Sequence, residues 1–385
     1  MRIGIDLFSL DRPGGNFGVG RGVYAWNLLP DLFRLGREHR FVVFVNRENE
    51  SLVPHADNVD VICSRLSNRI RPLRILHEQI GLFLSFWRRR LDLLHMLGND
   101  TCLLLGKRTL LTVYDLMWKY YLDSGRKNLK NLYFSLSVPQ SLKRTGAIIT
   151  ISRFIAQQTQ DIFPFTQGKI FPVSLACPPE KRVEPDLFSS YEKKYPFSFV
   201  FSVTTSLPHK NLQLLLQAFQ QLKNSGNFPD KLVICGQLKG GFHRQTVDFI
   251  ARHDLQDDVL LSGFIAEEEK QFLFKRSKLF VFPSLYEGFG LPILEAMQAG
   301  IPVVAARAAS LPEVGGEACI YFDPFSVEDL LAAMAKVLSD EYLRQRLIAK
   351  GKERVAEFSW AKTSRLTVDI YHKLFYSNHQ ARDGK

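Results

Sequence analysis

The sequence predicts an α/β protein built from two doubly wound parallel sheets. At 385 residues, the chain has the length of two domains. Short apolar runs alternate with helical patterns in both halves, which is typical of βαβ units and parallel sheets. The apolar runs are residues 3–7, 41–45, 59–63, 93–96, 110–113 and 147–151 in the first half, and 199–203, 232–235, 259–261, 279–282 and 303–305 in the second.

Prolines mark the boundary between the two predicted domains. Pro178, Pro179, Pro185 and Pro196 gather in one stretch, and prolines at this density discourage regular structure. We therefore expect a first domain over residues 1–177, a linker over residues 178–196 and a second domain over residues 197–360.

Composition narrows the class of protein. The formal net charge is +11 and the pI is about 9.4, which suits nucleic acid, an anionic membrane or phosphorylated ligands as partners. The five cysteines are scattered without a Cys-x-x-Cys motif, which is typical of reduced thiols in a cytosolic protein. The chain begins directly in a predicted strand and has no apolar run of ~18 residues, so we expect a cytoplasmic protein without a signal peptide or membrane span.

One stretch carries the clearest chemical signal. Residues 279–282 are an apolar run suited to a buried strand, and residues 291–299 have a helical pattern with Pro292 in the first turn, where proline is tolerated. Between them, Gly288 and Gly290 allow the backbone to approach a ligand closely. A helix N-terminus has unpaired N–H groups that favour phosphate. The stretch therefore predicts an anion site around Gly290 and Leu291.

Two carboxylates, Glu287 and Glu295, lie on either side of this loop. A glycosidase acid and nucleophile would have to lie roughly 5–9.5 Å apart, whereas eight residues along a helix span about 12 Å. We therefore expect separate tasks, with each carboxylate holding hydroxyls at a different part of one long ligand. The alternative is that both are solvated surface glutamates.

The full string from Pro283 to Met297 resembles the E-x7-E signature of retaining glycosyltransferases with the GT-B fold, in particular family 4, or glycosyltransferase group 1. Residues 300–304 and 310–314 continue the resemblance. It implies two Rossmann-like domains that face each other across a cleft, with residues 361–385 forming a last helix that packs back on the first. The donor nucleotide would bind in the second domain, and the acceptor would enter from the first.

The resemblance also implies roles in the second domain. Glu295 would hold ribose hydroxyls, Glu287 sugar hydroxyls, and Lys210 the donor diphosphate. His209 replaces the arginine that usually precedes this lysine. The donor-binding residues expected here are His209, Lys210, Gly263, Phe264, Glu287, Gly288, Phe289, Gly290, Leu291 and Glu295.

In the first domain, a glycine-rich loop follows the first strand. Its glycines do not have the G-x-G-x-x-G dinucleotide spacing, but Gly18, Gly20 and Arg21 resemble the family's first loop near the donor diphosphate. Tyr114 and Asp115 end a strand where the family usually has His-Asp. By this resemblance the expected catalytic residues are Glu287, Lys210, Asp115 and Tyr114.

Residues 65–90 combine arginines with an apolar run at 80–87, and Glu78 is the only acid among them. The arginines are Arg65, Arg69, Arg71, Arg74, Arg88, Arg89 and Arg90. The pattern favours either an interfacial segment on an anionic membrane or a core helix with solvated arginines at its ends. Nucleic-acid binding is disfavoured, because no nucleic-acid module accompanies the basic residues.

The sequence therefore predicts a retaining glycosyltransferase that moves a hexose, from UDP-glucose or a similar UDP-hexose, to a glycan or lipid-linked saccharide in polysaccharide biosynthesis. A GDP-mannose-dependent mannosyltransferase of the same fold and a non-catalytic nucleotide- or glycan-binding protein are the alternatives. No Asp-x-Asp motif is present, so we expect neither a metal nor another cofactor. Peripheral attachment to the inner face of the plasma membrane is a further expectation.

Overall fold

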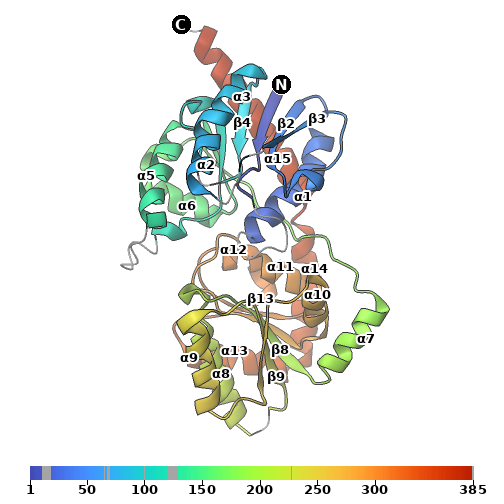
Figure 1. Cartoon of the computed structure of the whole chain (residues 1–385). Coiled ribbons are helices and arrows are strands. Elements are labelled where there is room, and N and C mark those ends of the chain that lie inside the picture. The colour runs from blue at the N-terminus through green and yellow to red at the C-terminus, as the bar shows by residue number, and fades with distance from the viewer. Residues whose placement is uncertain are drawn as a thin grey trace. The chain divides into compact units, whose positions relative to one another are not determined.

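The computed structural model describes residues 1–10, 19–64, 66, 70–98, 100–119, 129–226 and 228–383. The chain divides into two compact units (Figure 1). The first comprises Met1–Leu175 with Ser359–Lys385, and the second comprises Ala176–Phe358. Each unit is an α/β domain with one parallel sheet, and each is described by itself below.

The sheet of the first unit has seven parallel strands in the order β3-β2-β1-β4-β5-β6-β7. They are β1 (Arg2–Asp6), β2 (Arg40–Asn46), β3 (Val59–Ser64), β4 (Leu93–Met96), β5 (Thr109–Val113), β6 (Ala147–Thr150) and β7 (Ile170–Pro172). Strands β1 to β6 correspond to the six apolar runs predicted in this half. The edge strand β7 was not predicted, because it is only three residues long and ends in a proline.

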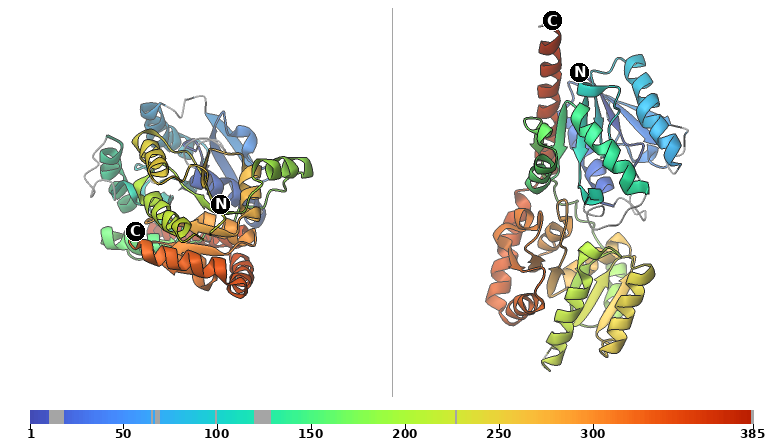
Figure 2. Two further views of the ribbon diagram at one scale, coloured as in Figure 1. Left: turned by 90° about the horizontal axis from the view of Figure 1, so that it is seen from below. Right: turned by 90° about the vertical axis from the view of Figure 1, so that its left-hand side faces the viewer.

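Helices surround this sheet and include the C-terminal segment. They are α1 (Val19–Leu35), α2 (Arg71–Leu76), α3 (Leu82–Arg88), α5 (Leu129–Arg144), α6 (Arg153–Ile162) and α15 (Trp360–Asp383). Shorter turns are η1 (Glu50–Leu52), η3 (Gly106–Arg108), η4 (Pro164–Thr166) and the π-helical turn η2 (His77–Gly81). Figure 2 shows α15 running beside the sheet of this unit.

Buried hydrogen bonds attach α15 to the first unit. The hydroxyl of Tyr371 lies 2.7 Å from Nδ1 of His95 on β4, and both side chains are fully buried. Ser364 Oγ donates to the carbonyl oxygen of Leu28 on α1 at 3.1 Å. The end of the chain therefore completes the first domain.

The sheet of the second unit has six parallel strands in the order β10-β9-β8-β11-β12-β13. They are β8 (Phe199–Val203), β9 (Lys231–Cys235), β10 (Val259–Gly263), β11 (Leu279–Phe282), β12 (Val303–Ala306) and β13 (Cys319–Phe322). The predicted apolar runs correspond to β8 through β12. The neighbours β8 and β11 lie at the centre of the sheet, so the loops that follow them meet at its carboxyl edge.

The helices of this unit are α7 (Pro185–Lys194), α8 (Leu212–Asn224), α9 (Gly240–Arg252), α10 (Glu267–Arg276), α11 (Leu291–Gln298), α12 (Leu311–Gly315), α13 (Val327–Ser339) and α14 (Glu341–Ala356), with the short turns η5 (Pro208–Lys210) and η6 (Gly316–Ala318). Among the helices of the described ranges, none combines the length and apolar character needed to cross a membrane.

The expectation of an irregular linker over residues 178–196 is wrong for its second half, where α7 lies. Pro185 is the first residue of α7, a position where proline's missing N–H costs nothing. Phe188 and Tyr191 of α7 pack on Phe272, with ring centroids 4.9 and 5.5 Å apart. The prolines therefore flank a helix that the second unit stabilises by packing.

Two acids are buried near the carboxyl edge of the first sheet. Asp6 ends β1 and is 3% exposed, and Glu78 lies in the π-helical turn and is 6% exposed. Burial raises the pKa of Asp6 to about 7. Burial, together with the charge of Asp6, raises the pKa of Glu78 to about 8. The positive charge of Arg74 lowers both pKa values, but by less than burial raises them. Its Nε lies 3.6 Å from Glu78 Oε1.

The raised pKa of Asp6 predicts that stability falls as the pH rises. The unfolded chain releases this proton near its ordinary pKa of 3.8, whereas the folded chain keeps it until about pH 7. At ~1.4 kcal/mol per pKa unit, the upper limit of the loss is about 4 kcal/mol. Asp6→Asn should therefore gain free energy of unfolding over the natural chain between pH 4 and 7, and the gain should level off above pH 8.

Denaturant unfolding across this pH range checks the prediction, with Asp57→Asn at an exposed position as the matched control. Parallel stability curves for Asp6→Asn and the natural chain would show that Asp6 ionises equally in both states.

Candidate active site

The loop between β11 and α11 carries Glu287 and is anchored on both sides. Ser310 Oγ lies 2.9 Å from the carbonyl oxygen of Glu287 and 2.7 Å from that of Phe289. The amide of Leu285 donates to the carbonyl oxygen of His209 at 2.7 Å, which ties this loop to the one that follows β8. Two segments far apart in the sequence therefore form one platform at the carboxyl edge of the sheet.

Gly290 begins α11 in a conformation that requires glycine. Its φ is 105°, and a Cβ there would lie 2.7 Å from Cδ2 of Leu311. Pro292 occupies the first turn of the helix. The first N–H groups of a helix have no intrahelical acceptors, so the close backbone packing at Gly290 leaves a helix N-terminus suited to an anion.

Lys210 and Glu287 form an ion pair across the two loops. Lys210 Nζ lies 2.6 Å from Glu287 Oε1, and the side chains are only 17% and 16% exposed. Lys210 Nζ also lies 5.6 Å from the ring centroid of Phe282. Partial shielding from water makes this attraction stronger than that of an exposed pair. An anionic ligand at this edge would compete with Glu287 for the lysine.

A strained backbone position holds Lys210 in place. Lys210 ends the turn η5, and Asn211 follows with φ 55°, a left-handed conformation that asparagine tolerates better than most residues. Asn211 Nδ2 donates to the carbonyl oxygen of Pro324 at 2.8 Å. This hydrogen bond anchors the residue that directly follows Lys210 and precedes α8.

His209, which is among the expected donor-binding residues, does not supply positive charge near pH 7. The side chain is 3% exposed, and burial, with a contribution from the nearby charge of Lys210, lowers its pKa to about 4. His209 is therefore neutral near pH 7, and its backbone carbonyl contributes the hydrogen bond from Leu285 described above. The positive charge at this edge comes from Lys210.

Glu295 lies on α11 and pairs with a lysine that the sequence did not single out. Lys270 Nζ of α10 lies 3.0 Å from Glu295 Oε1 and 3.0 Å from Glu267 Oε1. Burial by itself would lower the pKa of Lys270, but the two carboxylates raise it above its ordinary value. Lys270 therefore stays protonated and fixes the Glu295 carboxylate, whose side chain is 11% exposed. The E-x7-E motif gives no sign of Lys270, which lies 25 residues before Glu295.

The remaining residues expected to bind the donor differ from one another in how far they are exposed. Gly263 ends β10 with φ 69°, and the ring of Phe264 beside it is 58% exposed, which suits stacking on a base. Phe289 is buried and packs edge-on against Phe358 at 5.8 Å, so its side chain belongs to the core. Gly288 and Leu291 are half-buried beside the start of α11.

In the first unit, Tyr114 and Asp115 follow β5 at the carboxyl edge of that sheet. The ring of Tyr114 is 5% exposed and lies edge-on to Tyr24, with centroids 5.6 Å apart. Burial raises the pKa of Tyr114 well above its ordinary value, so the phenol stays protonated. Asp115 Oδ1 accepts a hydrogen bond from the amide of Met117 at 3.0 Å. Tyr114 is thus a neutral, buried group, and Asp115 shapes the turn that follows the strand.

The glycine loop is only partly described. Gly18 lies outside the described residues, whereas Gly20 and Arg21 lie in the first turn of α1. Gly20 is exposed, and a Cβ there would meet nothing within 4 Å. Arg21 is half-buried, and its charge offsets a small part of the rise that burial causes in the pKa values of Tyr114 and Glu78.

Part of the chain matches a known protein family. Residues 184–354 match the family described as "Glycosyl transferases group 1". The chain is 29% identical over 267 residues to the serotype-specific mannosyltransferase WbdA of Escherichia coli, covering 68% of this chain and 32% of that protein. It is 30% identical over 247 residues to the O-antigen chain mannosyltransferase B of Escherichia coli, covering 63% of this chain and 64% of that one. The chain thus spans about a third of the first relative and less than two thirds of the second.

Similarity to solved structures extends over both units. Sucrose-phosphate synthase from Thermosynechococcus elongatus superposes with a TM-score of 0.72 at 18% identity, covering 98% of this chain and 99% of that one. At this identity the likeness shows the fold. The second unit is therefore similar to the group 1 glycosyltransferases over residues 184–354, and the chain has the GT-B fold of two Rossmann-like domains.

Proposed function

We propose that the chain is a retaining mannosyltransferase that uses GDP-mannose and adds mannose to a glycan or lipid-linked saccharide in polysaccharide assembly. The observation that carries glycosyl transfer is the shielded Lys210–Glu287 pair beside the N-terminus of α11. The choice of sugar rests on the relatives, two of which are named as mannosyltransferases. These names favour mannose over the UDP-glucose that the breadth of the family suggested.

The leaving diphosphate is the group that this site would stabilise. Negative charge grows on the diphosphate as the bond to the sugar breaks, and fixed positive groups aimed at that charge lower the barrier. Lys210 and the N–H groups at the start of α11 would supply them. Glu287, displaced from Lys210 by the phosphate, would then accept hydrogen bonds from sugar hydroxyls.

Glu295 would bind the ribose of the nucleotide. Its carboxylate is already oriented by Lys270, so little side-chain entropy remains to be lost when hydroxyls bind. The exposed ring of Phe264 would stack on the base. Lys270 acts here as a positioning residue, because its task is to hold Glu295.

The stereochemistry we propose is retention by attack on the same face as the leaving group. Double displacement would need a carboxylate nucleophile on the opposite face, and Glu287 has the task of binding sugar hydroxyls. The departing diphosphate would accept the proton of the acceptor, so that the protein contributes positioning and charge stabilisation. No metal or other cofactor takes part in this scheme.

We also propose that α2, η2 and α3 bind an anionic membrane. Leu76, Ile80, Leu84 and Trp87 are all exposed and recur at helical spacing along one side, while the opposite side is buried through Leu82 and Phe86. Exposed arginines Arg88 and Arg90 end this segment, and Arg108 lies 4.5 Å from the Trp87 ring centroid. An apolar stripe flanked by arginines suits an interface of anionic lipid. Arg65 and Arg69 lie outside the described residues.

The donor assignment predicts a preference among nucleotide sugars. GDP-mannose should bind at least about tenfold more tightly than UDP-glucose, a difference of ~1.4 kcal/mol, and turnover should release GDP in the presence of EDTA. Calorimetry and a nucleotide-release assay with a mannose-containing lipid-linked acceptor measure both. Turnover of UDP-glucose in place of GDP-mannose would overturn the sugar assignment. Loss of activity in EDTA that Mg²⁺ restores would overturn metal independence. Binding of the donor without turnover would favour the alternative of a non-catalytic binding protein.

Substitutions of the two glutamates should affect different steps, catalysis for Glu287 and nucleotide binding for Glu295. Glu287→Gln should lower kcat more than donor affinity, whereas Glu295→Ala should weaken nucleotide binding about ten- to a hundredfold, since a charged hydrogen bond is worth roughly 1.5–3 kcal/mol. Steady-state kinetics and calorimetry separate the two effects, with Glu353→Gln at an exposed position of α14 as control. Full activity in Glu287→Gln, or an inverted product by NMR, would contradict the mechanism.

The membrane proposal predicts binding to anionic liposomes that decreases at high salt. Replacing Leu84 and Trp87 with serine should weaken binding at least about tenfold, because burying each apolar side chain contributes roughly 1.5–3 kcal/mol. Phe325→Ser, at an exposed site of the second unit, is the matched control. Co-sedimentation measures the effect. Equal binding to neutral liposomes, or equal losses in both variants, would contradict the proposal.

A further inference from the structure

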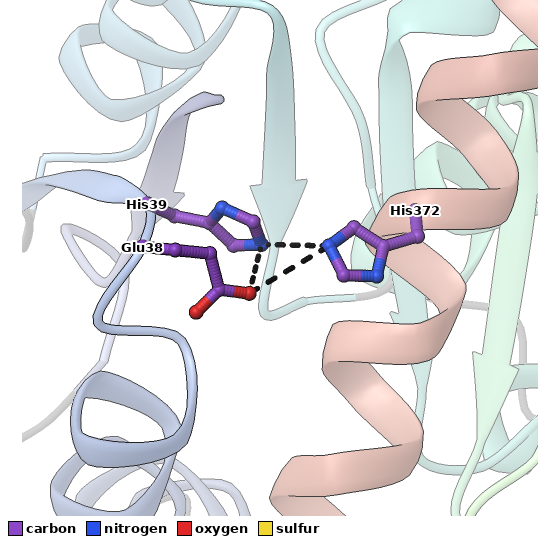
Figure 3. Close-up of side chains that lie close together, drawn as sticks. All are labelled: Glu38, His39 and His372. Carbon is purple, nitrogen blue, oxygen red and sulfur yellow. Dashed lines mark hydrogen bonds and ion pairs between the residues drawn. The ribbon is translucent and has the colours of Figure 1, made fainter.

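Three side chains that can bind metal converge at the amino edge of the first unit's sheet (Figure 3). Glu38 and His39 lie directly before Arg40, the first residue of β2, and His372 lies on α15. His39 Nε2 is 3.0 Å from His372 Nε2 and 3.3 Å from Glu38 Oε1. His372 Nε2 is 3.8 Å from the same carboxylate oxygen. The three atoms therefore form a compact triangle.

The size of this triangle matches one face of a zinc coordination sphere. Zinc binds imidazole nitrogen and carboxylate oxygen at about 2.0–2.2 Å, usually as a tetrahedron. Two donor atoms in such a tetrahedron are about 3.4 Å apart. The separations of 3.0, 3.3 and 3.8 Å lie on both sides of that value, so small side-chain rotations would equalise them.

The surroundings of the histidines suit a cation with exchangeable solvent on one side. The side chain of His39 is 4% exposed, whereas those of His372 and Glu38 are 38% and 54% exposed. Without a metal, one of the two Nε2 atoms carries a hydrogen and donates a hydrogen bond to the other.

A second observation concerns the other nitrogen of the buried ring. Within the described part of the chain, Nδ1 of His39 has no hydrogen-bond partner. The ring therefore has only Nε2 through which to interact, and Nε2 faces His372 and Glu38 (Figure 3). Bound to a metal through Nε2, the neutral ring would keep its proton on Nδ1.

We propose that Glu38, His39 and His372 bind one Zn²⁺ ion that fixes α15 to the turn between α1 and β2. A three-residue site of two imidazoles and a carboxylate leaves a fourth position for water. The ion would join residues 333 positions apart in the sequence and so stabilise the return of α15 to the first unit. The site lies at the amino edge of the sheet, opposite the carboxyl edge where Asp6 and Tyr114 lie, and its role does not depend on the proposed transfer reaction.

Zinc binding to the chelator-treated full chain tests this site. The natural chain should bind one Zn²⁺ and melt at a higher temperature with zinc than with chelator. His372→Ala should lose affinity by more than ~100-fold, since even outer-shell partners of metal ligands contribute about 10–100-fold. His379→Ala, an exposed histidine further along α15, should behave like the natural chain.

Co²⁺ provides a readout that does not depend on stability. The natural chain and His379→Ala should give the visible absorption of tetrahedral cobalt, and His372→Ala and Glu38→Gln should lose or shift it. Equal zinc effects on the melting of all variants, or no cobalt absorption in the natural chain, would overturn the proposal and leave a hydrogen-bonded histidine pair.

Discussion

The ion pair between Lys210 and Glu287 is the interaction on which the candidate active site depends. The two residues follow the neighbouring central strands β8 and β11, so the fold brings them together although they are 77 positions apart in the sequence. Each charge is largely shielded, and leaving either one unpaired would be costly. A ligand that replaces the pair must therefore offer an anion to the lysine and hydroxyl donors to the glutamate. A sugar diphosphate offers both.

The backbone around this pair is fixed by residues that carry no charge themselves. Gly290 and Asn211 adopt left-handed conformations, and the Ser310 hydroxyl bridges two carbonyl groups of the Glu287 loop. Glycine adopts such a conformation freely, whereas at Asn211 it has a free-energy cost that packing must offset. These contacts hold the backbone of both loops, and charge stabilisation depends on groups that are fixed in this way.

The local pattern of apolar and polar residues is sufficient to predict most of the strands, but the partners of individual side chains can be identified only in the structure. Strands β8 and β11 have the predicted bounds because they are apolar and end at polar or proline residues. The sequence does not predict helix α7, because prolines at this density discourage regular structure, whereas Pro185 is the first residue of that helix. Lys270 could not be predicted, since its pairing with Glu295 depends on how α10 packs beside α11. Burial of His209 and of Glu78 depends likewise on tertiary packing, and it changes their charge near pH 7.

The most direct test of the account is whether Lys210 binds the second phosphate of the donor. Calorimetry should compare GDP with GMP for the natural chain, Lys210→Met and the charge-balanced Lys210→Met/Glu287→Gln. The natural chain should prefer GDP, and both variants should lose about ten- to a hundredfold of that preference, the range expected for a charged hydrogen bond of roughly 1.5–3 kcal/mol. An unchanged ratio of GDP to GMP affinity in the two variants would contradict the assignment of Lys210 to the leaving diphosphate.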